Sequence, residues 1–328
     1  MNFTNHPFLF LAVLMMSVSC TSQNKQMDNL LTPEELDKKP IIFSLEEALE
    51  NPDSVYRFGL TNRGLTEFPE EIFKFKNLQE LFLTDNELTT IPKRIEDIIL
   101  LQSLIVASNK LEAIPTEVGN LKNLRILNFI SNNLKTIPAS IYTLENLEQL
   151  RISGNYITSL SDNISQLKKL EELLIDLNPI KELPETIGDL TKLKILSIEG
   201  FQDGNSTQRY STDKTTYLQR LPNSITKLTS LEKLSFFLTS VESLPEDIGN
   251  LKQLKILYMH ETNLKALPES IGKLTQLEEL TFHKTQVSEL PKSLYNLKKL
   301  DELTLWYCPI DKEEVENLKK ALPNTQII

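Results

Sequence analysis

Apolar residues recur along this chain with a period of 23 residues. Each unit follows the pattern LxxLxLxxNxLxxLPxxIxxLxx, in which most x positions are polar. The step from Leu193 to Leu231 is 38 residues, which indicates one repeat with an insertion of 15 residues. The units begin at Val55, Leu78, Leu101, Leu124, Leu147, Leu170, Leu193, Leu231, Leu254, Leu277 and Leu300.

The pattern predicts two structural elements in each unit. The LxxLxL segment ends in strict alternation, which is typical of a short strand with one buried face. The PxxIxxLxx segment has a spacing of three and opens with proline, which suits the first turn of a helix or a 3₁₀ helix. One unit cannot bury its apolar face alone, so we expect neighbouring units to stack and their strands to run parallel.

This pattern resembles the signature of the leucine-rich repeat, in the 23-residue class that carries LPxxI. The resemblance covers residues 55–310, or about 11 repeats. It implies an α/β solenoid, with a curved parallel sheet on the concave side and short helical or 3₁₀ segments on the convex side. It also implies a non-enzymatic module that binds another protein through its concave face. One unit shows the signature in Leu124, Leu127, Phe129, Asn132, Leu134, Ile137, Pro138, Ile141 and Leu144.

A column of asparagines follows the predicted strands in the first half of the array. An amide buried there can bond to backbone groups of its own turn and of the neighbouring repeat, so we interpret the column as structural. Cys308 takes the same position in the last repeat, which predicts a structural residue rather than a nucleophile. The column consists of Asn86, Asn109, Asn132, Asn155 and Asn178, followed by Thr239, Thr262 and Thr285.

Aromatic side chains gather at one register position of the last four repeats. Phe237, His260, His283 and Trp306 each follow the LxL core, and Tyr258 and Tyr307 flank them. We interpret this set as a ligand-binding surface, because rings give a large contact area at low entropic cost. The alternatives are cross-strand stacking that only stabilises the sheet, and a weak metal site built on His260 and His283 with Glu261 or Glu279.

Two further features could extend this surface. The apolar residues Phe82, Ile105, Ile130 and Leu174 are also predicted to face the concave side, as a secondary patch. The insertion, within residues 199–217, is rich in polar residues and should form a loop at the rim of the concave face. Its role could be binding or a tolerated surface decoration.

The N-terminus has the features of an export signal. Residues 7–18 form an apolar run that is too short for a bilayer, which takes roughly 20 residues. Ser17 and Ser19 precede Cys20 in a pattern that resembles the lipobox of bacterial lipoproteins, although the family prefers leucine at the position of Ser17. The resemblance implies a signal peptide over residues 1–19, a lipidated Cys20 and a polar tether over residues 20–40. The protein would then lie in the bacterial cell envelope, on the outer membrane or cell surface; a secreted or a cytoplasmic chain is the alternative.

Segments without the repeat pattern flank the array. Residues 41–54 contain a capping box that begins at Ser44 and predicts a short helix ending near Pro52. Residues 311–328 contain an amphipathic segment from Glu313 to Ala321 and then a short extended end. We interpret these two segments as the N-terminal and C-terminal caps.

Composition and missing motifs exclude several functions. The formal net charge of −10 argues against nucleic acid as a partner. The two cysteines form no CxxC pair, and no GxxxxGK[ST], HExxH or GxSxG motif is present, so we expect no enzyme activity, no metal and no cofactor. We expect a monomer that binds an unidentified protein ligand. A structural envelope spacer or adhesin is an alternative, as is an intracellular scaffold if the export signal is misread.

Overall fold

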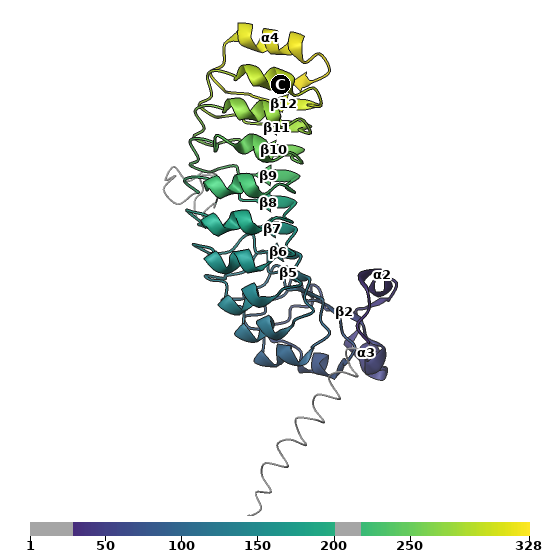
Figure 1. The fold of residues 1–328 in the computed structure, drawn as a ribbon. Coiled ribbons are helices and arrows are strands. Elements are labelled where there is room, and N and C mark those ends of the chain that lie inside the picture. Colours follow the sequence, from purple (N-terminus) through teal and green to yellow (C-terminus); the bar gives the residue numbers. More distant parts are fainter. Residues whose placement is uncertain (1–28, 201–217) are drawn as a thin grey trace, which may run out of the picture.

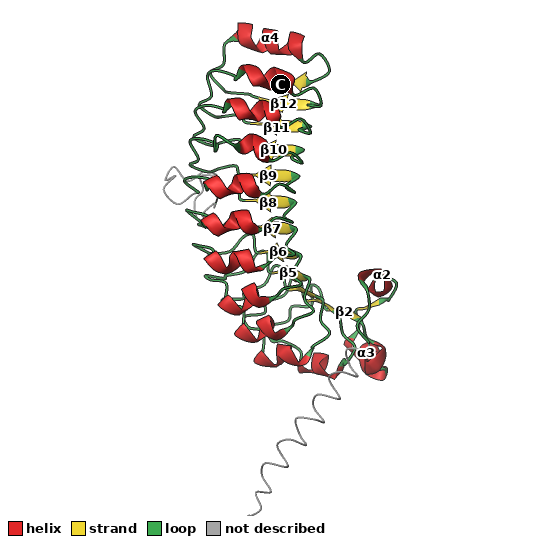
Figure 2. Cartoon of the chain, in the orientation of Figure 1, coloured by secondary structure: helices red, strands yellow, loops and turns green. Residues whose placement is uncertain are grey.

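The computed structural model describes residues 29–200 and 218–328 (Figure 1). The predicted signal peptide, Cys20 and most of the insertion lie outside these residues. Within them, 13 strands form one sheet in which the strands follow each other in chain order and pair in parallel. The strands run along one side of the array and the 3₁₀ helices along the other (Figure 2). This architecture confirms the predicted leucine-rich-repeat solenoid.

The strands are short and evenly spaced along the chain. They are β1 (Ile41–Ile42), β2 (Arg57–Gly59), β3 (Glu80–Phe82), β4 (Ser103–Ile105), β5 (Ile126–Asn128), β6 (Gln149–Arg151), β7 (Glu172–Leu174), β8 (Ile195–Ser197), β9 (Lys233–Ser235), β10 (Ile256–Tyr258), β11 (Glu279–Thr281), β12 (Glu302–Thr304) and β13 (Gln326–Ile327).

The opposite side of the array consists of 3₁₀ helices, and α-helices occur only near the two ends of the described chain. The 3₁₀ helices are η1 (Pro52–Ser54), η2 (Glu70–Lys74), η3 (Lys93–Asp97), η4 (Thr116–Asn120), η5 (Ala139–Thr143), η6 (Asp162–Gln166), η7 (Glu185–Asp189), η9 (Asn223–Lys227), η10 (Ile248–Asn250), η11 (Glu269–Lys273) and η12 (Lys292–Asn296). The α-helices are α2 (Pro33–Leu36), α3 (Leu45–Glu50) and α4 (Lys312–Ala321).

The register of the sheet follows from the period of the sequence. Leu127 pairs with Leu150, and Leu150 pairs with Leu173, at a separation of 23 residues each time. Leu196 pairs with Leu234 in the same manner, although 38 residues separate them. The insertion therefore leaves the sheet unbroken, and every strand presents the same positions to the concave side.

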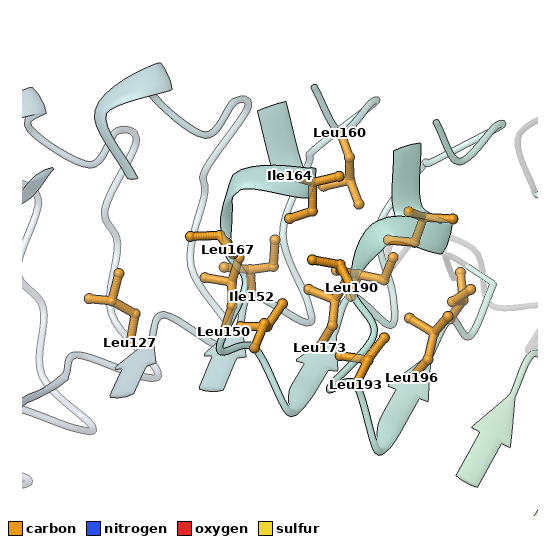
Figure 3. Packing of buried hydrophobic residues seen from close by; sticks show 14 of the residues in the cluster. Leu127, Leu150, Ile152, Leu160, Ile164, Leu167, Leu173, Leu190, Leu193 and Leu196 are labelled. Carbon is orange, nitrogen blue, oxygen red and sulfur yellow. The ribbon is translucent and has the colours of Figure 1, made fainter. Parts of the chain in front are cut away.

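The core is a continuous stack of leucine and isoleucine side chains between the sheet and the 3₁₀ helices (Figure 3). Leu127, Leu150, Leu173 and Leu196 are each 0 % exposed. Ile164 from η6 packs into the same cluster from the other side. Each repeat buries its apolar residues against the next one, which is how a solenoid builds a core in one dimension.

The asparagine column bonds each repeat to the preceding one. Asn155 is 1 % exposed, and its Nδ2 donates to the carbonyl oxygens of Phe129 and Ile152, both at 2.9 Å. Its Oδ1 accepts from the backbone N–H of Leu134 at 3.0 Å. Cys308 keeps part of this geometry at the end of the array, because its Sγ donates to the carbonyl of Phe282 at 3.1 Å. The column therefore satisfies backbone groups of the turns.

The N-terminal cap begins earlier than the sequence suggested. The described residues 29–40, which we expected in a polar tether, include α2, and this helix buries Leu36 to 2 % exposure. The backbone of Leu31 bonds to the side chains of Gln79 at 2.9 Å and Gln102 at 2.8 Å. Because buried amides need partners, these two glutamines hold the segment against the first repeats. The tether expectation is thus wrong for residues 29–40.

The C-terminal end of the array is covered by α4 (Figure 1). Asp311 caps this helix by accepting from the backbone N–H of Glu313 at 2.7 Å, and Leu318 is 0 % exposed. After the helix, β13 pairs in parallel with β12. These elements cover the last apolar face, as a terminal repeat must.

Candidate ligand-binding surface

Three rings stack face to face across neighbouring strands on the concave side. The centroids of Phe237 and His260 are 4.3 Å apart and their planes meet at 15°. His260 and His283 follow at 4.6 Å and 10°. Since these residues occupy the same position of successive repeats, the parallel register places each ring directly beside the next. We call these three residues, together with Trp306 at the same position of the next repeat, the ring column.

The C-terminal end of the ring column is open to solvent. Trp306 is 55 % exposed and the next residue, Tyr307, is 81 % exposed. Tyr307 has a φ of 56°, which turns the chain away directly after the tryptophan. The sequence left open whether Trp306 is partly covered by the cap, and the structure leaves more than half of this residue exposed. A large ring held at the surface is available for contact with a partner.

The two histidines are half-buried and neutral at neutral pH. Burial, with a smaller contribution from His283, lowers the pKa of His260 from 6.5 to about 4, and burial also lowers the pKa of His283. The Nδ1 atoms of both rings are buried without a hydrogen-bond partner among the described residues. An unperturbed imidazole titrates near pH 6.5, so the structure places the titration of His260 well below that point.

Metal binding was the weaker alternative for these histidines. No group of three or more histidine, cysteine, aspartate or glutamate side chains among the described residues is arranged to hold a metal ion.

Tyr258 lies on the same face, two residues before His260 along β10. Its hydroxyl donates to the carboxylate of Glu279, and the ammonium of Lys233 lies 5.4 Å from its ring centroid. Burial and then the hydrogen bond to Glu279 raise the pKa of Tyr258 to about 12. Tyr258 is therefore fixed in place, as a neutral ring beside the ring column.

Two carboxylates continue the row beyond Phe237, and sequence reasoning missed them. Asp176 and Glu199 occupy the register position of the ring column in the two preceding repeats. The backbone N–H of Glu199 donates to Asp176 at 2.9 Å, and the hydroxyl of Ser153 donates to the same carboxylate at 3.1 Å. Burial and then Asp176 raise the pKa of Glu199 to about 7. The 23-residue period of the sequence is sufficient to place both residues in this row.

The secondary patch does not form one surface. Phe82 and Ile105 pair across β3 and β4. Asn128 and Arg151 then occupy the same position of β5 and β6, so two polar side chains separate this pair from Leu174. Ile130 lies two residues beyond Asn128, in a different row. The polar residues of the intervening repeats therefore break the patch.

Comparisons with known proteins agree with the fold. Residues 223–325 match the family described as leucine-rich repeat region, and residues 99–157 match the family described as leucine rich repeat. Comparison with curated proteins found no match. Both matched segments cover parts of the repeat array, and the parallel sheet with its 3₁₀ helices has the fold of a leucine-rich-repeat solenoid.

Solved structures of similar fold come from plants and bacteria. A plant peptide hormone receptor, RGFR1 in complex with RGF2, is 29% identical with a TM-score of 0.65, over 84% of this chain and 42% of the receptor. The Arabidopsis receptor kinase HAESA, in complex with the peptide hormone IDA and the co-receptor SERK1, is 26% identical with a TM-score of 0.65, over 75% and 41%. This chain therefore spans less than half of either receptor.

An internalin from Listeria monocytogenes is 20% identical with a TM-score of 0.63, over 85% of this chain and 81% of the internalin. At this identity the likeness shows the fold alone.

Among the described residues, no helix is long and apolar enough to cross a membrane.

Proposed function

We propose that this protein is a non-enzymatic interaction module that binds a protein ligand through the C-terminal half of its concave face. The observation that carries the proposal is the ring column with its open end. The core is complete without these rings, because Leu257, Leu280 and Leu303 of the same strands are each 0 % exposed. An exposed Trp306 beside ordered rings is the arrangement from which interface hot spots are made.

The plant receptors support this assignment. Two leucine-rich-repeat receptors of similar fold were solved in complex with peptide ligands, RGF2 and IDA. The curved sheet of a solenoid offers a long surface on which an extended ligand can contact several repeats.

We also propose that the mature chain is held to a bacterial envelope membrane by a lipid on Cys20. The support is the apolar run of residues 7–18 and the small residues before Cys20. Several acyl chains on one cysteine would anchor the protein stably, whereas a single chain binds a membrane marginally.

The test of ligand binding is a pull-down with the immobilised full chain and with a variant carrying Trp306→Ala and Tyr258→Ala. Proteins retained by the native chain and lost by the variant support the proposal. Tyr156→Ala is the matched control, because Tyr156 is 50 % exposed and lies outside the ring column. If the native chain and the double variant retain the same proteins, the ring column is not the binding surface, and a structural spacer becomes the better interpretation.

A further inference from the structure

Asp176 and Glu199 occupy the same register position as the ring column, so carboxylates and rings form one continuous row across neighbouring repeats. β8 pairs directly with β9, so Glu199 lies beside Phe237, and the backbone N–H of Gly200 donates to the carbonyl of Phe237 at 2.9 Å. Asp176 lies on the other side of Glu199, across β7 and β8. The row consists of the residue that lies two positions after the end of each strand from β7 to β12, and it reads Asp176, Glu199, Phe237, His260, His283 and Trp306.

At the N-terminal end of this row, no cationic side chain of the described residues forms a salt bridge with Asp176 or Glu199. Glu199 is half-buried, and no described side chain donates a hydrogen bond to its carboxylate. Among the described residues, Asp176 accepts from two neutral donors, the hydroxyl of Ser153 and the backbone N–H of Glu199. Neutral donors satisfy the oxygen atoms but leave the charge, and burying a charge without a counter-ion is costly. The raised pKa of Glu199 is the consequence.

The rest of this concave surface is also acidic. At the concave positions of β8 to β12 and in the row that follows these strands, the described side chains include three carboxylates, Glu199, Glu279 and Glu302, and one lysine, Lys233. The tyrosine hydroxyl bonded to Glu279 and the threonine hydroxyl bonded to Glu302 at 2.8 Å are both neutral donors. The surface is thus complementary to a ligand that brings positive charge.

We infer that the row binds an extended peptide segment that places a lysine or arginine side chain against Glu199 and Asp176 and an apolar or aromatic side chain against the ring column. This inference rests on the proposed function and specifies the chemistry of its ligand. Glu199 and Trp306 are four strand spacings apart, or about 19 Å. An extended segment of about six residues spans that length. Two adjacent carboxylates supply too few ligands for a calcium ion, which takes six to eight oxygen atoms.

The experiment selects binders from a displayed library of random peptides on the immobilised full chain. We expect the selected peptides to be enriched in lysine or arginine a few residues from an aromatic residue. Synthetic copies of the selected peptides are then titrated against the native chain and against Glu199→Gln, which keeps the shape of the side chain. We expect Glu199→Gln to weaken binding about ten-fold or more, as the loss of one partner of a desolvated charge pair does.

Matched variants separate this inference from the proposed function. Glu246→Gln is the control, because Glu246 is exposed in the turn before η10, off the concave face, and should leave affinity unchanged. Peptides that bind through Trp306 but are insensitive to Glu199→Gln would overturn the cationic ligand and leave the interaction surface standing. Peptides insensitive to both Trp306→Ala and Glu199→Gln would overturn both. Melting curves of each variant show whether the fold is intact.

Affinity should also depend on pH through Glu199. Its ionised form binds the cation, so affinity should fall between about pH 8 and pH 5, by up to ten-fold for each pH unit below the pKa of about 7. Asp176 and Lys233 are the charged groups that face Glu199 from the neighbouring strands, and His260 lies beyond Phe237. Glu199→Gln should flatten the profile. A profile unchanged by that variant, or a shift in melting temperature with Ca²⁺ alone that depends on Glu199, would overturn the assignment.

Discussion

His260 and His283 lie ring to ring, with their centroids 4.6 Å apart and their planes 10° from parallel. Two imidazoles at this distance cannot both carry a proton without repulsion, and burial already opposes the charged form of each. The pair is therefore built for the neutral state, and acid should disrupt it.

The stability of the protein should reflect this pair. The pKa of His260 is about 4 in the folded chain and about 6.5 when the chain is unfolded, so the unfolded state takes up more protons between these values. The stability present above about pH 6.5 is lost as pH falls toward 4. For this ring we expect a loss of roughly 1–2 kcal/mol, reduced from the full shift because the ring is partly hydrated.

Urea unfolding of the native chain and of His260→Phe at several pH values measures this effect. Phenylalanine keeps the stack but cannot take up a proton, so the difference in unfolding free energy between the two chains should change with pH. A constant difference between about pH 6.5 and 4 would contradict the expectation.

Asn155→Ala should destabilise the array by roughly 1–3 kcal/mol, because it leaves the N–H of Leu134 unpaired in the interior and removes the bonds that Asn155 donates to the carbonyl oxygens of Phe129 and Ile152. Asn128→Ala should cost less than about 0.5 kcal/mol, since Asn128 is only half-buried and makes one local bond to the N–H of Ile130. Chemical denaturation of both variants measures the two values. Equal losses would mean that the asparagine column does not hold the repeats together.

Trp306→Ala should change ligand affinity far more than stability. An aromatic hot spot contributes about 2 kcal/mol or more to binding, whereas an exposed residue outside the core changes the unfolding free energy by about 0.5 kcal/mol or less. Phe236→Ala is the opposite case, since Phe236 is 0 % exposed and its loss should cost about 3–5 kcal/mol. Thermal melts and a binding titration on the two variants should therefore rank them in opposite orders.

Cys20→Ala should release the protein from membranes without affecting the repeats. Detergent partitioning and fatty-acid labelling in an expressing bacterium provide the measurement. Cys308→Ala is the control, because Cys308 is the other cysteine of the chain and its sulfur bonds to the carbonyl of Phe282 inside the last repeat. Labelling that persists in Cys20→Ala would rule out the lipid on this residue.

Periodicity was sufficient to predict the solenoid and to place Phe237, His260 and His283 side by side. Leu196 and Leu234 pair in register although 38 residues separate them, and the sequence pattern already implied this by resuming unchanged. The same pattern could not distinguish Gln79 and Gln102 from solvent-facing residues, because their burial depends on contact with Leu31, far away in the chain. The pattern also could not show how far Glu199 and the histidine rings are buried. It therefore could not predict their pKa values, since a pKa depends on burial and on neighbours from other repeats.

The direct pairing of β8 with β9 separates the length of the chain from the shape of the sheet. Because β8 and β9 pair directly, the number of residues between Gly200 and Leu218 can change at a cost that grows only slowly with loop length. A new binding element could therefore be acquired at this point, next to Glu199, without disturbing the described contacts of the row. In an engineered version the same junction would accept a grafted peptide or a reporter domain while the rest of the concave surface stays as it is.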